Sequence, residues 1–137
     1  MTLPVNARVE AAPNFIANLA AAHAFFALQD EESADLRLSK LKAELREMTS
    51  VLSWSPGTGR PARFLTGRSA QARLRTETVL RLAEQAGLPS LREYVVGQHI
   101  ALYAHSDVEV VLPALKHQRQ LTYNADHRAD EPRIGAA

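Results

Sequence analysis

The chain has 137 residues, of which 16 are lysine or arginine, 15 are aspartate or glutamate and none is cysteine. A chain of this length can bury one hydrophobic core, so we expect a single, nearly neutral globular domain. Without cysteine it forms no disulfide and offers no thiolate as nucleophile or metal ligand. This composition fits a reducing compartment, and we expect a cytoplasmic protein.

Charge is distributed unevenly along the chain. Residues 1–59 carry five basic and seven acidic side chains, a net charge of −2, whereas residues 60–137 carry eleven and eight, a net charge of +3. Five arginines fall within sixteen consecutive residues that contain no acidic side chain: Arg60, Arg63, Arg68, Arg73 and Arg75. Such a positive segment attracts phosphates or an acidic protein. The alternative is a solvated surface whose arginines pair with acids elsewhere in the fold.

The N-terminal segment alternates apolar residues with polar residues or proline, which is the period of a half-buried strand. The apolar positions are Leu3, Val5, Ala7 and Val9. We therefore expect a short first strand, and Pro13 then suits the first turn of a helix that runs to about Leu28. Residues 15–28 are apolar enough to suggest a signal peptide. Polar residues interrupt them, however, and they are shorter than the ~20 residues of a membrane span, so we interpret them as an amphipathic helix.

A second helix is expected after the acidic turn at residues 30–33, because negative side chains stabilise a helix N-terminus. Its apolar residues recur at steps of three and four, and they are Leu38, Leu41, Leu45, Met48 and Leu52. This pattern predicts an antiparallel helical hairpin that packs on a sheet. A coiled-coil dimer is less well supported, since the apolar seam spans barely two heptads.

Residues 53–61 contain two glycines and two prolines and are predicted to form a loop. The loop lacks the lysine that follows the glycine of a Walker motif, because Arg60 follows Gly59, so we do not expect a nucleotide-binding loop. A third helix is expected over residues 69–86, ended by a glycine and a proline. The last residues, 124–137, are small, charged and aperiodic, which predicts a flexible tail.

Three runs near the C-terminus are rich in β-branched and aromatic residues and are separated by short turns. They cover residues 91–96, 99–105 and 108–115. They predict an antiparallel meander in which one face of the middle strand covers helices and the other is more solvated. Pro113 lacks a backbone donor and predicts a bulge or an unpaired position in the last strand.

Together these elements predict an α+β fold. We expect a small twisted antiparallel sheet, made of the N-terminal strand and the C-terminal three-stranded meander. The sheet packs against a helical hairpin, with one inserted extra helix.

The element order resembles the RelE/ParE superfamily of bacterial type II toxin–antitoxin toxins. The similarity includes the Gly-Arg-Pro loop after the second helix and is strongest over residues 91–123, where the meander leads into the basic segment Lys116, His117 and Arg119. On this resemblance, residues 1–123 form one toxin domain, and residues 66–90 are an inserted helical segment that departs from the family pattern.

The resemblance implies a cytoplasmic toxin of a plasmid stabilisation module, which inhibits growth and is neutralised by a cognate antitoxin, with no cofactor and no membrane association. The toxin would be a homodimer or a hetero-oligomer with its antitoxin. Members like ParE poison DNA gyrase, whereas members like RelE cleave mRNA in the ribosome. The segment at residues 111–120 is closer to ParE, so we favour a gyrase-directed toxin. The alternatives are a ribosome-dependent mRNA endonuclease and a non-toxic binding scaffold of the same fold.

Metal-free RNA cleavage needs a base, an acid and cations that stabilise the phosphate. If the chain is a nuclease, the candidate catalytic residues are His117, Arg119 and Tyr123. The candidates for binding the target are Arg60, Arg63, Arg92 and Lys116. Arginines of the inserted segment are candidates for binding the antitoxin: Arg73, Arg75 and Arg81. The alternative is that these are ordinary polar surface residues.

We predict no metal site. His99 and His105 share a strand face, but six residues of strand separate them by about 20 Å, which is too far for one ion. Trp54 and Tyr103 could stack on bases, although a lone tryptophan next to a proline-containing loop more often covers the hydrophobic core.

Overall fold

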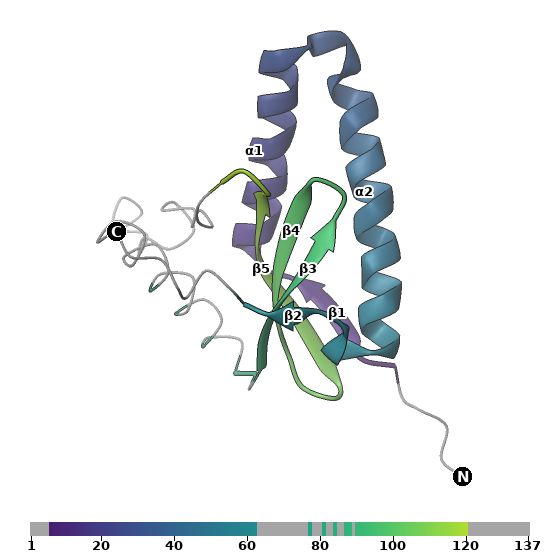
Figure 1. Ribbon diagram of the computed structural model, residues 1–137, viewed down its shortest axis with the longest axis vertical. Helices are drawn as coiled ribbons and strands as arrows, with labels where there is room; N and C mark the ends of the chain where they lie inside the picture. Colours follow the sequence, from purple (N-terminus) through teal and green to yellow (C-terminus); the bar gives the residue numbers. More distant parts are fainter. Residues whose placement is uncertain are drawn as a thin grey trace, which may run out of the picture.

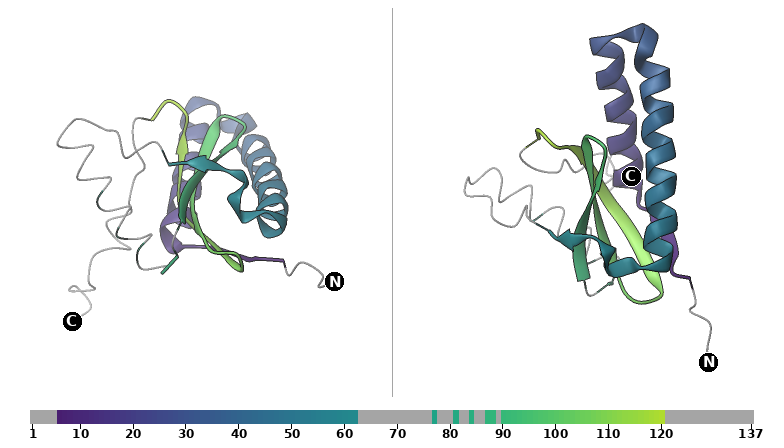
Figure 2. Two further views of the ribbon diagram at one scale, coloured as in Figure 1. Left: turned by 60° about the horizontal axis from the view of Figure 1, so that its bottom comes forward. Right: turned by 45° about the vertical axis from the view of Figure 1, so that its right-hand side comes forward.

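The computed structural model describes residues 6–62, residues 90–120 and five isolated positions between them. Two helices form an antiparallel hairpin that packs on one face of a five-stranded sheet, and the closed end of the hairpin projects beyond the sheet (Figure 1, Figure 2). This confirms the predicted α+β fold. The elements are β1 (Arg8–Ala11), α1 (Pro13–Gln29), α2 (Glu31–Trp54), a short 3-10 helix (Pro56–Thr58), β2 (Arg60–Pro61), β3 (Ser90–Val96), β4 (His99–His105) and β5 (Glu109–His117).

The first helix, α1, begins and ends as its sequence predicts. Pro13 occupies the first turn, where its missing N–H costs nothing. Phe15 and Phe26 are buried in the core, and the smaller Leu19 and Ala22 pack against it between them. The apolar stretch is therefore one face of an amphipathic helix. Among the described residues, no helix combines the length and apolar character needed to cross a membrane.

The second helix, α2, buries its apolar seam against the sheet. Leu41, Leu45, Met48 and Leu52 all belong to the core. The Asp30 carboxylate accepts a hydrogen bond from the Glu32 N–H at 3.2 Å and caps the N-terminus. The helix continues to Trp54, so the loop predicted from residue 53 starts later than expected, and the indole is 67% exposed and does not cover the core.

The strands lie in the order β1-β5-β4-β3-β2, with β3, β4 and β5 as the expected antiparallel meander. The first strand differs from the prediction in two respects. It begins at Arg8, and it pairs with β5 in parallel, from Arg8 opposite Glu109 to Ala11 opposite Leu112. The sheet is therefore mixed, because the path through the hairpin and meander brings β5 back in the direction of β1.

The central strand β4 is buried on both faces, so the expected solvated face is wrong. Ala101 and Tyr103 join the core beneath the helices. On the opposite face, Ile100 and Leu102 form a second cluster with Ala114. A strand at the middle of a five-stranded sheet has neighbours on both edges, and here apolar residues also cover both faces.

A bulge interrupts β5 at the position where Pro113 predicted one. Leu102 pairs with Ala114 and Ala104 pairs with Val111, so β5 has one residue more than β4 over this interval. Beyond the end of β1, the backbone of β5 forms its hydrogen bonds with side chains of α1 instead of with a neighbouring strand. Asn14 Nδ2 donates to the Pro113 carbonyl oxygen at 2.9 Å, and Asn18 Oδ1 accepts from the Leu115 N–H at 2.9 Å.

The turn between β3 and β4 has two residues, Gly97 and Gln98. Gly97 has a φ of +58°, whereas Gln98 does not have a positive φ. A positive φ at the first central position is the requirement of a type II′ hairpin turn, which glycine meets without strain.

The inserted segment is described only in part. Three positions of the expected third helix, Glu77, Arg81 and Glu84, are helical and exposed. The other predictions for residues 66–90 concern positions outside the described residues, apart from Gly87, Leu88 and Ser90. The predicted tail at residues 124–137 also lies outside the described residues.

Candidate functional site

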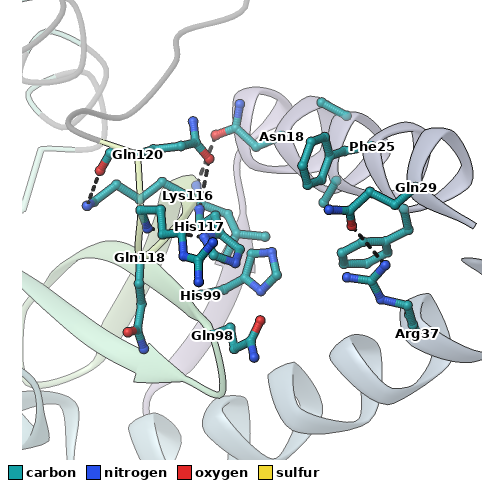
Figure 3. Close-up of a pocket in the computed structure, with 15 residues that line it drawn as sticks. Asn18, Phe25, Gln29, Arg37, Gln98, His99, Lys116, His117, Gln118 and Gln120 are labelled. Carbon is teal, nitrogen blue, oxygen red and sulfur yellow. Dashed lines mark hydrogen bonds between the residues drawn. The ribbon is translucent and has the colours of Figure 1, made fainter.

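A pocket of about 610 Å³ lies between α1 and the adjoining ends of β4 and β5 (Figure 3). The three residues of the expected basic segment, Lys116, His117 and Arg119, all line it. They are joined by two residues that were not predicted as part of this site, Arg37 of α2 and His99 at the start of β4, which was considered only as a metal ligand. The described residues that line the pocket include no aspartate or glutamate, so its wall is electropositive.

Two imidazoles meet in this pocket. His99 of β4 lies opposite His117 of β5, so both side chains point to the helix-facing side of the sheet. Their ring centroids are 5.2 Å apart with an interplanar angle of 79°, an edge-to-face contact. The other side of His99 contacts the Phe26 ring, with centroids 6.0 Å apart.

The environment of His99 keeps its ring neutral at pH 7. Its pKa is lowered from 6.5 to about 4, chiefly because burial disfavours the charged imidazolium and then because His117 and Arg37 add positive potential. A neutral imidazole can accept or donate one hydrogen bond without bringing charge into the pocket.

The turn after β5 holds His117 in one tautomer. The Arg119 N–H donates to His117 Nδ1 at 3.1 Å, so the proton of the neutral ring lies on Nε2. The His117 N–H donates to Gln120 Oε1 at 2.8 Å, and the Gln120 N–H donates to the His117 carbonyl oxygen at 3.0 Å. These bonds make residues 117–120 a preformed edge of the pocket.

Arg37 brings a positive charge into the pocket from α2. Its guanidinium stacks over the Phe26 ring, 4.2 Å from the centroid, and Nη1 donates to Gln29 Oε1 at 2.9 Å. Both contacts leave the charge unneutralised. No ion pair to Arg37 is found within the described part of the chain.

Lys116 differs from its neighbours in the basic segment, because its side chain points away from the imidazoles of His99 and His117 (Figure 3). It lies opposite Ile100, on the sheet face away from the helices, and its Nζ donates to the Gln120 carbonyl oxygen at 2.9 Å. Burial lowers the pKa of Lys116, while the Glu93 carboxylate acts in the opposite direction. The expected trio therefore lines one pocket without presenting three cations to the same space.

Two other arginines expected to bind the target, Arg60 and Arg92, lie outside this pocket. Arg92 Nη1 donates to the Gly59 carbonyl oxygen at 2.9 Å, and its Nε donates to His105 Nε2 at 3.2 Å. Arg60 Nε lies 3.7 Å from a carboxylate oxygen of the buried Glu93. Both side chains hold the segment around β2 against β3.

Tyr103 fixes the same segment and is fully buried, so it is not available to stack on a base. Its hydroxyl donates to the Pro56 carbonyl oxygen at 2.7 Å and accepts from the Gly59 N–H at 2.8 Å. A Cβ at Gly59 would lie 2.5 Å from the Glu93 carbonyl oxygen, which explains why the Gly-Arg-Pro loop has glycine there.

The remaining candidates do not join the pocket in the part of the chain that is described. Arg81 is exposed on its helical segment. Four others lie outside the described residues: Arg63, Arg73, Arg75 and Tyr123. Within the described ranges, no three potential metal ligands come together.

No protein-family model and no curated protein matches this chain.

Proposed function

We propose that the chain is the toxin of a type II toxin–antitoxin module, which inhibits growth by poisoning DNA gyrase and is neutralised by a cognate antitoxin. The proposal starts from the resemblance of the sequence to RelE/ParE toxins. It is supported by the α+β fold, in which a helical hairpin covers a C-terminal meander, and by the basic segment at the end of β5.

The observation that favours a protein target is that three of the four cations expected to bind the target have partners within the fold. Arg92 binds the Gly59 carbonyl, Arg60 lies beside Glu93, and Lys116 binds the Gln120 carbonyl. A nuclease needs such cations directed at the scissile phosphate. Poisoning by protein contact has no such requirement.

The exposed end of the helical hairpin offers a surface for protein contact. Phe25 and Leu28 of α1 and Leu36 of α2 are 51%, 86% and 73% exposed. All three belong to the turns of α1 and α2 near the closed end of the hairpin, and exposed apolar surface on a projecting element is suited to protein contact. We therefore expect this end of the hairpin to contact the target.

The decisive experiment is inducible expression in bacteria together with a supercoiling assay on purified gyrase. We expect growth arrest, filaments and DNA breaks, and inhibition of supercoiling by the purified chain. Co-expression of the antitoxin, sought in the neighbouring reading frame, should restore growth. Leu28→Glu combined with Leu36→Glu should abolish gyrase inhibition at unchanged stability, whereas Ala43→Glu, at another exposed position of α2, should not. Growth arrest with intact DNA and active gyrase would refute the proposal.

A ribosome-dependent mRNA endonuclease is the second candidate, and the contact between His99 and His117 favours it. Two adjacent imidazoles can act as base and acid, and Arg119 can stabilise the phosphate. In a translation extract, this activity would show as mRNA cleavage that is lost in His117→Ala and retained in His23→Ala. Harmless expression in the absence of antitoxin would instead indicate a binding scaffold.

A further inference from the structure

We propose that the pocket between α1 and the ends of β4 and β5 binds a nucleoside monophosphate, either free or as the end of a nucleic acid strand. The phosphate would lie among Arg37, His117 and Arg119, and the base would lie against Phe25. This inference does not depend on which target the chain has.

The size of the pocket points to a ligand larger than a simple anion. Its volume of about 610 Å³ falls within the range of about 300–1,000 Å³ that is typical of small-molecule sites. A phosphate group alone would fill a small part of this space. The remaining wall comes from α1, where Phe25 and Ala21 supply apolar surface.

The charge of the pocket fits a phosphate. Arg37 and Arg119 are always protonated at neutral pH, and the described lining contributes no carboxylate. Arg37 has five N–H donors in a planar fork, and the partners of its side chain among the described residues are the neutral Gln29 and the Phe26 ring. The adjoining smaller hollow shares Arg37 and His99 with this pocket and adds Lys40 and Glu44 of α2. Its one carboxylate is therefore outnumbered by two cations, and the net charge of the two hollows together is positive.

The imidazoles add hydrogen-bond donors with a fixed geometry. Because the Arg119 N–H occupies His117 Nδ1, His117 presents Nε2–H as a donor. His99 stands in contact with that ring, so a bound anion lies close to both histidines.

An aromatic surface is available for the base. Phe25 lines the pocket from α1, whereas the imidazoles come from the strands (Figure 3), and its side chain is 51% exposed. The neighbouring Phe26 ring is already covered by Arg37 and His99. Stacking on an aromatic ring is a general way to bind any base, because every base has a π-face.

An acidic peptide would meet the same cations, but the edge of β5 disfavours it. An extended peptide gains affinity by pairing with a free strand edge. Here, Asn18 already accepts from the Leu115 N–H and Gln120 from the His117 N–H. A peptide in this pocket would therefore lose the main-chain hydrogen bonds that strand addition provides.

The proposal is tested by titrating the purified full chain with AMP, adenosine and inorganic phosphate, while the side-chain resonances of His99 and His117 are followed by NMR. AMP should shift both histidines and bind at least about tenfold more tightly than adenosine or phosphate alone. Arg37→Gln and Arg119→Gln should each weaken AMP binding about tenfold, the loss expected for a charge-assisted hydrogen bond. Arg46→Gln, at an exposed site of α2 outside the pocket, is the matched control.

Phe25→Ala separates the two halves of the ligand, because it should weaken AMP binding and leave phosphate binding unchanged. A 5′-phosphorylated oligonucleotide that binds more tightly than AMP, with no binding of its unphosphorylated form, would identify the ligand as a strand end. Tighter binding of AMP than of the 5′-phosphorylated oligonucleotide would identify the ligand as a free nucleotide. The proposal is overturned if the histidines do not shift at millimolar AMP. It is also overturned if phosphate binds as tightly as AMP, if an acidic peptide is preferred, or if the arginine variants match Arg46→Gln.

Discussion

The His99 imidazole is buried between Phe26, His117 and Arg37, and its pKa of about 4 contrasts with about 6.5 in an unfolded chain. As the pH falls below 6.5, the unfolded state takes up a proton that the folded state accepts only near pH 4. The unfolded state is thereby favoured, so this stabilisation is complete at neutral pH and is lost on acidification.

We expect the free energy of unfolding to fall by about 2 kcal/mol through His99 between pH 7.5 and pH 5. Urea unfolding of the wild type and of His99→Gln over this range measures the difference. The other groups around the ring, His117, Lys40 and Glu44, remain in the variant and serve as the internal control. Equal pH dependence in the two proteins would contradict the assignment.

The buried hydroxyl of Tyr103 stabilises the fold through two hydrogen bonds. Tyr103→Phe leaves the Pro56 carbonyl and the Gly59 N–H without this partner, which should cost about 2 kcal/mol of unfolding free energy. Tyr94→Phe is the matched control, because Tyr94 is half-buried against the same core and its hydroxyl forms no hydrogen bond with any described residue. Thermal or urea unfolding of both variants measures the difference, and similar losses would show that the hydroxyl bonds are not important.

Among the elements, the turn at Gly97 is sensitive to substitution because its φ is positive. Gly97→Ala forces a Cβ into a left-handed conformation and against the Glu44 carboxylate, so we expect a loss of about 1–2 kcal/mol. Gly57→Ala is the control, since a Cβ there meets no atom within 4 Å. Urea unfolding compares them, and a Gly97 variant as stable as the Gly57 variant would exclude this strain.

The two helices and the meander could be predicted because their signals are local. The spacing of Leu41, Leu45, Met48 and Leu52 fixes which face of α2 is buried, whatever the rest of the chain does. The Gly97-Gln98 turn similarly fixes the register of β3 and β4. The parallel pairing of β1 with β5 has no local signal, because it joins segments from opposite ends of the sequence.

The pocket was only partly predictable, for a reason that lies in the bulge of β5. Without the extra residue, the pairing of Ala104 with Val111 would continue regularly and place Lys116 opposite His99. The bulge moves the register by one residue, so that His117 faces His99 and Lys116 turns to the other side of the sheet. Pro113 predicted an irregularity, but a sequence does not state how many residues a bulge inserts, nor that Arg37 of a distant helix will face the same space.

The helices, the meander and the basic segment belong to one continuous arrangement. The hairpin packs over the sheet, α1 replaces a strand along the outer part of β5, and the end of β5 forms the pocket. The two proposals use neighbouring parts of this arrangement, and Phe25 belongs to both. Contact with gyrase would also involve Leu28 and Leu36, whereas nucleotide binding would also involve Arg37 and Arg119, so variants at these residues distinguish the two proposals.

The pairing of β1 with β5 also affects the order in which parts of the fold form during synthesis. Arg8 leaves the ribosome early, yet its partner Glu109 follows about 100 residues later. Contacts so distant in sequence form slowly, because a long stretch of chain must first be closed into a loop. A nascent polypeptide therefore has both helices before it has the strand that completes the sheet. Since β5 also supplies one wall of the pocket beside α1, a nascent chain lacks that wall until β5 has been synthesised.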